Sequence, residues 1–479
     1  MKFTACPMDC LDACSVIYDN GKCRPSDGII TQGKLCKLFG YLQSEKTLSD
    51  PNLKNTLEKA ANKLKEPNQK ILYYKGLGNL GEMQAIPTQF FQKIGATFTH
   101  SGMLCDEAGD SGLKMGRGYN VNPPLKTLLN SEVVIVWGQN ITDTSTHIYR
   151  LIKDKIFITI DPVKTKIASK SKVFLQIKPK GDYLLAQMMQ SFLENKSIDT
   201  SNYSKLNISK EDFEKMMKLI SNKRISVMLG VGPQKYKEGA QIFHEIDKVC
   251  YKLGLLDGEN KGVWYIDTKA YGFNTKIFNN KINTIPCASV KFDEFDIVFI
   301  QGANPVVTSV NTQKIVKQLQ NSFVIFMGTT LNDTSKYADI IIPAKTFLEK
   351  NDVRLACSHD EVSYCEVCEE NDNAISEYEL TKYLFEFFNF DGLLSEEEYL
   401  KSYKKQRASK PTFTFKSHDT NFVEMHQLNK DEYYLLTSKS SNTLNSQYKY
   451  DSYAYIHPSS GLNEEQEITI KSSVISIDI

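Results

Sequence analysis

The chain has 479 residues, of which 41% are hydrophobic and 24% are charged, and its formal net charge is +1. This length suggests about three domains, and the near-zero charge argues against a general attraction to nucleic acid or to an anionic membrane surface. No apolar run approaches the roughly 20 residues that cross a bilayer. The amino terminus lacks an export signal, and 11 cysteines, an odd number, do not resemble a secreted disulfide framework. We therefore expect a cytoplasmic protein with no nucleic-acid partner and no direct membrane insertion.

Five of the cysteines lie in the first 49 residues, which we expect to form a cysteine module. Three residues separate Cys6 from Cys10 and Cys10 from Cys14, and Cys36 closes the sequence GKLC. Three close thiolates and one distant thiolate favour a [4Fe–4S] cluster. Structural zinc, which favours CxxC pairs, and unrelated thiols are the alternatives. Cys23 is either a small buried residue or a replacement for Cys36 as a ligand.

Beyond the module, apolar strands alternate with helices. The module itself is expected to hold a hairpin turn at Asn20–Gly21. Continuously apolar strands are typical of parallel sheets that are covered on both faces. We expect a loop over 99–112, which is rich in glycine and acidic residues. The other expected helices lie over 53–65, 181–195, 236–254, 311–320 and most of 371–405, with one more near 144–154 and one that ends at about 95. The expected strands lie over 70–76, 133–138, 155–162, 173–179, 224–232, 296–305, 323–330 and 338–344.

This alternation predicts an α/β fold with two interleaved, doubly wound lobes after the cysteine module. One lobe is expected to combine two separate stretches of the chain, and a partial β-barrel-like domain is expected at the carboxyl end. The predicted boundaries are 1–49 for the [4Fe–4S] module, 50–99 with 270–405 for one lobe, 100–269 for the other, 406–428 for a linker and 429–479 for the partial β domain.

Two expected strands end at the same pattern, Gly-x-Asn. Gly138 and Asn140 follow one strand, and Gly302 and Asn304 follow another. Ligands of open α/β sheets bind at the carboxyl ends of strands, and glycine lets backbone N–H groups approach a pyrophosphate. Asp161 ends a third strand, where its carboxylate would accept hydrogen bonds from a ribose or a guanine, or would cap a helix.

Cys105 stands alone in the sequence SGMLCDEAG, between the two runs of alternating strands and helices. A lone cysteine is usually an inert apolar residue. A cysteine flanked by glycine and acidic residues is less usual in a core, and a domain junction is a natural place for a ligand site.

In their order along the chain, these motifs resemble the molybdopterin oxidoreductase superfamily, which includes the large subunits of formate dehydrogenase, periplasmic nitrate reductase and dimethyl sulfoxide reductase. The matching stretches are CPMDCLDAC with GKLC, SGMLCDEAGDSGL, WGQNITDTSTH, DPVKT, GANPVVTS, TSKYADIIIPAKTFLEKNDV and LLTSKSSNTLNSQY.

The resemblance implies a [4Fe–4S] cluster and two molybdopterin guanine dinucleotides that carry molybdenum or tungsten. It implies that Cys105 is a ligand of that metal and, with His147, a catalytic residue. The implied cluster ligands are Cys6, Cys10, Cys14 and Cys36, and the implied cofactor-binding residues are Lys37, Gly138, Asn140, Asp161, Gly302, Asn304, Asn445, Ser446 and Gln447.

The chain departs from the family pattern at several points. Lys37 follows Cys36 directly, and Leu38 occupies the position where the family usually has a basic residue between cluster and pterin. Asp106 follows Cys105, where formate dehydrogenases usually have histidine. The chain ends inside the expected carboxy-terminal domain, so we expect either a separate chain to complete it or a more open cofactor site.

The implied function is a two-electron redox reaction or an oxygen-atom transfer on a small substrate, with electrons passing through the cluster to a partner subunit. The competing hypothesis is a non-catalytic electron-relay or scaffold subunit without the metal, as in the large subunit of respiratory complex I. Cys105, Asp161 and the LNSQ sequence favour the enzyme, whereas the short carboxy-terminal domain favours the scaffold. A nucleotide-binding module with a zinc site is a third possibility.

Overall fold

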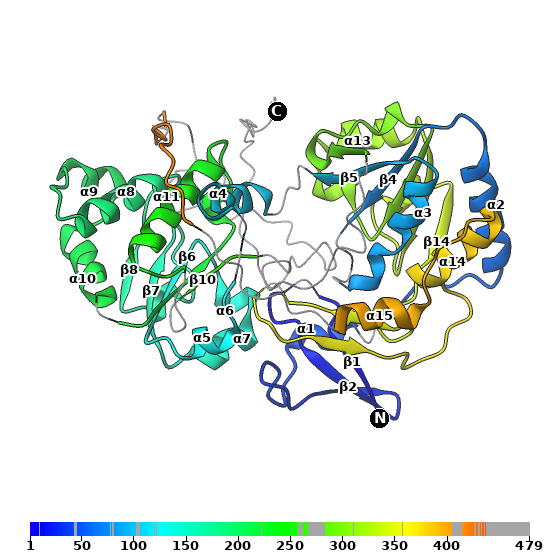
Figure 1. Ribbon diagram of the computed structural model, residues 1–479, viewed down its shortest axis with the longest axis horizontal. Coiled ribbons are helices and arrows are strands. Elements are labelled where there is room, and N and C mark those ends of the chain that lie inside the picture. The colour runs from blue at the N-terminus through cyan, green and yellow to red at the C-terminus, as the bar shows by residue number, and fades with distance from the viewer. Residues whose placement is uncertain are drawn as a thin grey trace, which may run out of the picture.

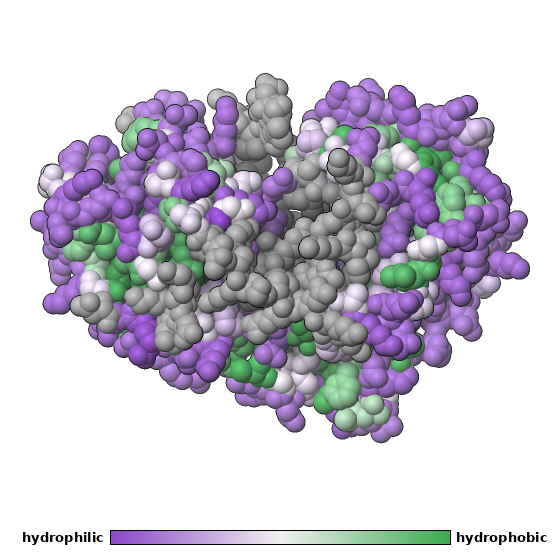
Figure 2. Space-filling view, viewed as in Figure 1, coloured by the Kyte–Doolittle hydropathy of each residue, from purple (hydrophilic) through white to green (hydrophobic). Residues whose placement is uncertain are grey.

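Two α/β lobes lie side by side, and the cysteine module lies at the base of the molecule, below the lobes in Figure 1. The face in Figure 2 is mostly hydrophilic over both lobes. No helix among the described residues has the length and apolar character needed to cross a membrane. The computed structural model describes residues 1–8, 10–42, 46–76, 78, 81–101, 106–118, 120, 122–221, 223–256, 262–266, 283–309, 311–356, 358–404, 414–425, 428, 429, 432, 434 and 436.

The cysteine module contains an antiparallel sheet of β1 (Lys2–Ala5), β2 (Ser15–Asp19) and β3 (Lys22–Pro25), followed by helix α1 (Lys37–Leu42). Asn20 and Gly21 join β2 to β3 with φ angles of 49° and 75°. Two positive φ angles at a two-residue connection are the signature of a type I′ hairpin turn. The predicted turn is therefore confirmed.

The second lobe is built on a five-stranded sheet in which every neighbouring pair is parallel. Alternate residues of β6 face two different cores, one formed with α4, α8 and α11 and the other with α5 and α7. This double coverage explains the continuously apolar sequence of the strand. The strands, in sheet order, are β10 (Gly262–Trp264), β9 (Ile225–Leu229), β6 (Val133–Trp137), β7 (Ile156–Ile160) and β8 (Val173–Leu175). The helices are α4 (Glu107–Arg117), α5 (Leu125–Leu129), α6 (Ile141–Thr144), α7 (Thr146–Ile152), α8 (Asp182–Leu193), α9 (Ser201–Leu206), α10 (Lys210–Ile220) and α11 (Gly239–Lys252).

The first lobe is built on a six-stranded parallel sheet, and the chain contributes to it in two visits, as predicted. The chain leaves after β5 and returns at β11, once the second lobe is complete. In sheet order, the strands are β11 (Asn283–Pro286), β5 (Thr97–Ser101), β4 (Ile71–Lys75), β12 (Ile297–Gln301), β13 (Phe323–Gly328) and β14 (Ile340–Pro343). The helices are α2 (Leu53–Lys65), α3 (Pro87–Lys93), α12 (Pro305–Thr308), α13 (Thr312–Leu319), α14 (Glu377–Phe388) and α15 (Glu396–Lys404), and a hairpin of β15 (Asp352–Arg354) and β16 (Ser363–Cys365) lies beside the cysteine module.

Both sheets are doubly wound, so each has one point where the strand order reverses. In the second lobe the reversal lies between β6 and β9, and in the first lobe it lies between β4 and β12. The crevice at the carboxyl ends of such strand pairs is where α/β sheets bind ligands. We call each of these two strand-end regions a switch point, so each lobe has one switch point.

The predicted loop over 99–112 is wrong at both ends, because residues 99–101 belong to strand β5 and Glu107 begins helix α4. Glycines suggested a loop, but Gly109, Gly112 and Gly116 line the face of α4 that packs closely against its neighbours. An added Cβ would overlap Tyr265 at the first position, Ala240 at the second and Phe415 at the third. The glycines are there for close packing, which outweighs their low helix propensity.

Residues 414–425, within the predicted linker, run along the second lobe, where Figure 1 draws them in orange over α11. The Phe415 ring stacks on Tyr251 with a centroid distance of 4.5 Å. The Thr420 hydroxyl donates to Glu245 Oε1 at 2.6 Å. Most of the predicted carboxy-terminal β domain lies outside the described residues.

Candidate cofactor site

The cysteine loop, residues 6–14, connects β1 to β2 and brings the predicted cluster ligands together. Cys6 and Cys14 are held at its two ends by a hydrogen bond from Cys6 N to Cys14 O at 2.8 Å. Burial, with a smaller contribution from the charge of Cys36, raises the pKa of Cys6 to about 12. Burial also raises the pKa of Cys14 strongly, followed by the charges of Asp12, Cys10, Cys6 and Cys36. Cys6 and Cys14 belong to one buried cluster of side chains, against which Cys23 and Cys36 also pack.

These raised pKa values define what the site needs. Cys10 is partly exposed at its surface, yet the surrounding atoms desolvate its thiol and raise its pKa well above the usual value. Several gathered thiols can lose their protons together only if positive charge enters the site, because bare thiolates would repel one another. Iron supplies such charge, and four cysteines are the usual donor set of a [4Fe–4S] cluster. The residues present thus fit the implied cluster. Cys23 lies on β3, opposite Tyr18.

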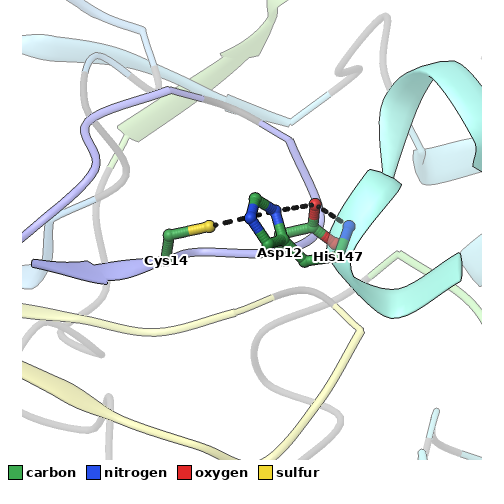
Figure 3. A group of neighbouring side chains, drawn as sticks. All are labelled: Asp12, Cys14 and His147. Carbon is green, nitrogen blue, oxygen red and sulfur yellow. Dashed lines mark hydrogen bonds and ion pairs between the residues drawn. The ribbon is translucent and has the colours of Figure 1, made fainter. Parts of the chain in front are cut away.

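His147 joins the cysteine loop to the second lobe, as Figure 3 shows. Its Nδ1 lies 3.4 Å from Cys14 Sγ and 3.2 Å from Asp12 Oδ2. Its Nε2 lies 3.0 Å from the carbonyl oxygen of Lys34, so both ring nitrogens face acceptors, the Lys34 carbonyl at Nε2 and the Asp12 carboxylate at Nδ1. The Asp12 carboxylate accepts from the backbone N–H groups of His147 and Ile148, and so caps the amino end of α7.

Asp12, Cys14 and His147 are all buried, and their ligand atoms lie within 4.8 Å of one another. Such a group can also hold a single metal ion. The predicted catalytic residue His147 therefore lies beside a predicted cluster ligand, and its catalytic role stays a prediction. Lys37 is exposed at the first position of α1.

Arg354, the last residue of β15, and two residues that follow the strand hold the cysteine loop from the other side. An Nη of Arg354 donates to Met8 O, Ser358 Oγ donates to Leu11 O at 2.7 Å, and His359 Nε2 lies 2.8 Å from Asp12 O. Burial lowers the pKa of His359, and the Glu361 N–H donates to its Nδ1 at 3.2 Å. His359 is therefore neutral with its proton on Nε2. The buried polar composition of this stretch was the one available signal, because charged residues are rarely buried unless they are paired.

At the switch point of the second lobe, glycines let two strand ends meet. Gly138 follows β6 with a φ of 61°, and its N–H donates to Ile160 O at 2.8 Å. The N–H of Gly230, after β9, donates to Trp137 O at 2.8 Å. A Cβ on Gly230 would overlap the carbonyl of Gly138. Only glycine allows this approach, so the predicted importance of Gly138 has a structural reason.

Two buried carboxyl groups lie at this edge of the second sheet. Burial raises the pKa of Asp161 to about 6, and the nearby charge of Asp182 adds to the shift. Burial likewise raises the pKa of Asp182 to about 6, although the Trp137 Nε1–H donates to it at 2.7 Å. Asp161 Oδ1 accepts from the Val163 N–H at 2.8 Å, which closes a turn and does not cap a helix. The rest of the Asp161 carboxylate can therefore serve a ligand.

The switch point of the first lobe repeats the glycine construction. Gly302 follows β12 with a φ of 56°, and a Cβ on Gly76, after β4, would overlap the Gly302 carbonyl. Asn304 is buried, and its Oδ1 accepts from Thr334 N at 3.1 Å and from Thr334 Oγ1 at 2.8 Å. Asn140 is likewise occupied within its own turn, where its Nδ2 donates to Asp143 at 2.9 Å. Both asparagine side chains therefore make hydrogen bonds within the protein that fix the backbone near their strand ends.

The predicted residues thus form three groups: the cysteine loop with His147, the second switch point with Gly138 and Asp161, and the first switch point with Gly302 and Asn304. Cys105 lies outside the described residues, in the short connection from β5 of the first lobe to α4 of the second. Asn445, Ser446 and Gln447 also lie outside the described residues.

Comparison with known proteins bears on this arrangement. The family model described as molybdopterin oxidoreductase matches residues 54–387. This chain belongs to the molybdopterin oxidoreductase family. It is 22% identical over 422 residues to the probable oxidoreductase YyaE of Bacillus subtilis, covering 73% of this chain and 63% of that protein. It is 22% identical over 404 residues to the alpha subunit of the F420-dependent formate dehydrogenase of Methanocaldococcus jannaschii, covering 67% of this chain and 60% of that protein.

This chain therefore spans about three fifths of the length of these two relatives. Among solved structures, acetylene hydratase from Pelobacter acetylenicus has a similar fold, with a TM-score of 0.63 and 13% identity, over 87% of this chain and 74% of that one. A likeness at this identity concerns the fold, and the same fold can serve different reactions.

Proposed function

We propose that this chain is a molybdopterin-dependent oxidoreductase subunit that carries out a two-electron redox reaction or an oxygen-atom transfer on a small substrate. The supporting observation is the gathering of Cys6, Cys10, Cys14 and Cys36 in one module of a chain that belongs to this family. A molybdenum or tungsten pterin would supply the two-electron chemistry, and a [4Fe–4S] cluster would pass single electrons to a partner subunit. We further propose that the protein works in the cytoplasm.

In this proposal the chain itself binds the cofactor, orients it and excludes water from the site. Asp161 accepts N–H or O–H groups from the guanine dinucleotide, since its carboxylate is buried and only partly used by Val163. Gly138 and Gly302, with positive φ angles, set the course of the backbone that would meet the cofactor at the two switch points. The remaining cofactor contacts proposed are Asn140, Asn304, Lys37, Asn445, Ser446 and Gln447.

Cys105 is proposed as the ligand of molybdenum or tungsten, since thiolates suit soft metal sites. The connection between the lobes that contains it is short, running from Ser101 at the end of β5 to Glu107 at the start of α4. The amino end of α4 is held firmly, because Gly109 N–H donates to Gln234 Oε1 at 2.7 Å and the Tyr265 hydroxyl donates to Asp106 O at 2.9 Å. Both ends of the connection are therefore anchored on different lobes.

Elemental analysis of the purified full chain tests the proposal. We expect about four iron atoms and one molybdenum or tungsten atom per chain. Iron without molybdenum or tungsten would instead support the electron-relay hypothesis, and zinc without iron would contradict both.

The Cys105→Ser variant should lose turnover of reduced viologen with a panel of small oxidised substrates, while its iron content stays at the wild-type value. Cys368→Ser is the matched control, because Cys368 is partly exposed and lies on the β16 side of the molecule, away from both switch points. Wild-type turnover by Cys105→Ser would show that Cys105 is not the ligand.

A further inference from the structure

We propose that Arg354 is the counter-charge of the iron–sulfur cluster and raises its reduction potential. This inference rests on the proposed [4Fe–4S] cluster and adds a residue that the family resemblance did not indicate. The sequence suggested a basic residue next to Cys36, and Lys37 was its nearest candidate. In the structure a different cation reaches the cysteine loop. It is Arg354 on β15, which lies 346 residues along the chain from its contact, Met8.

Arg354 is in place to act on the cysteine loop. Its side chain is buried, with the residue only 3% exposed, and an Nη donates to Met8 O, midway between Cys6 and Cys10. Arg354 and Cys6 also line the same small enclosed space together with Cys365. A buried guanidinium at this position cannot turn away to solvent, because Ser358 and His359 hold the following residues against Leu11 O and Asp12 O.

The charges around the loop show why a cation matters. The loop already holds the buried carboxyl group of Asp12, and thiolates that ligate a cluster would add further negative charge to it. The guanidinium keeps its charge at any working pH, whereas the neighbouring His359 is neutral. Arg354 thus brings a permanent positive charge to the backbone between Cys6 and Cys10.

Lys37 lacks these properties. It is exposed at the start of α1, where water and salt screen its charge. A cluster held by four thiolates is negatively charged, and reduction adds one more negative charge. A buried cation in a medium of low dielectric stabilises the reduced form more than the oxidised form, and therefore raises the reduction potential.

A redox titration of the full chain, followed by the electron paramagnetic resonance signal of the reduced cluster, tests the proposal. Arg354→Gln should have a more negative midpoint potential than wild type, and Arg354→Lys, which keeps the charge, should lie between the two. Arg24→Gln is the matched control: it removes one positive charge from the cysteine module itself, but its side chain is 62% exposed, so its potential should equal that of wild type. Lys37→Gln should shift the potential less than Arg354→Gln does.

A wild-type potential in Arg354→Gln, or a larger shift in Lys37→Gln, would overturn the proposal. If Arg354→Gln loses its iron, the iron content of Arg354→Lys decides: retained iron supports a role of the charge, and equal loss shows that only the shape of arginine is needed. Wild-type protein without iron would contradict the proposed function, whereas wild-type iron with an unshifted Arg354→Gln potential would contradict this inference alone.

Discussion

The two switch points share a backbone design but differ in their side chains. In both lobes a glycine with positive φ follows the strand at the reversal, and a second glycine lets the neighbouring strand end approach its carbonyl. The second lobe then presents two buried carboxyl groups, Asp161 and Asp182. The first lobe presents the buried amide of Asn304 and, at the end of β4, Lys75, whose pKa burial lowers.

The shared glycines set the shape of the two switch points, whereas the different polar side chains set which groups each switch point can bind. The glycines give the two switch points an equivalent backbone, which would suit the two similar dinucleotides of the proposed cofactor. The polar side chains make the two switch points unequal, because a carboxylate accepts hydrogen bonds only, whereas an amide both accepts and donates. The predictions below test whether the shared backbone and the different side chains have these separate roles.

The largest effect is expected where a glycine lets two backbones approach each other closely. Gly230→Ala in the second lobe and Gly76→Ala in the first should each lower the free energy of unfolding by about 3 kcal/mol, because the new Cβ would overlap the carbonyl of Gly138 or Gly302. Differential scanning fluorimetry measures the loss, and limited proteolysis shows which lobe opens first.

Gly40→Ala is the control for both variants. Gly40 lies in α1 with open space around the position of a Cβ, and alanine is the better helix former by about 1 kcal/mol. This variant should be as stable as wild type or slightly more stable. If all three variants behave alike, the close approach at the switch points does not matter for stability.

The next effect has the opposite sign and concerns the second lobe alone. Asp161→Asn should stabilise the cofactor-free protein at pH 8 by about 2 kcal/mol, because folding raises the pKa of this carboxyl from 3.8 to about 6. The folded state binds the proton more tightly, so the cost of the charged group is absent below pH 4 and complete above pH 6. The gain in melting temperature should therefore disappear between pH 6 and pH 4.

Asp182→Asn distinguishes stability from cofactor binding. Its carboxyl has the same raised pKa, of about 6, but it accepts from Trp137, so the stability gain should be similar. Molybdenum or tungsten content should fall in Asp161→Asn only. Wild-type metal content in Asp161→Asn would show that this carboxylate does not hold the cofactor.

The smallest expected effect compares the two asparagines. Asn304→Ala should cost about 2 kcal/mol, because it leaves the buried Thr334 N–H and hydroxyl without their acceptor. Asn140→Ala should cost less than about 1 kcal/mol, since its partners, Thr142 and Asp143, lie in a partly exposed turn. Chemical denaturation of the cofactor-free variants gives both values. Equal losses of unfolding free energy would contradict the expectation that the buried hydrogen bonds of Asn304 stabilise the fold more than the partly exposed ones of Asn140.

Much of the fold could be predicted because its signals are local. Continuously apolar segments such as residues 133–138 and 296–305 predicted the buried parallel strands, and Asn20–Gly21 predicted the hairpin turn. Helix α4 was missed for a local reason as well: its glycines favour a loop by propensity, and only their packing partners Tyr265, Ala240 and Phe415 explain them.

The sequence by itself determined the alternation of strands and helices, the crowding of cysteines in the first 49 residues and the glycines at the strand ends, because periodicity and spacing are read along the chain. Only the tertiary structure decided what surrounds those features. His147 and Arg354 reach the cysteine loop from opposite lobes, 135 and 346 residues away from their partners Asp12 and Met8. Burial changes the pKa values of the cysteines and strengthens the effect of the single charge of Arg354. Burial depends on the tertiary structure and is not specified by the spacing of residues along the sequence.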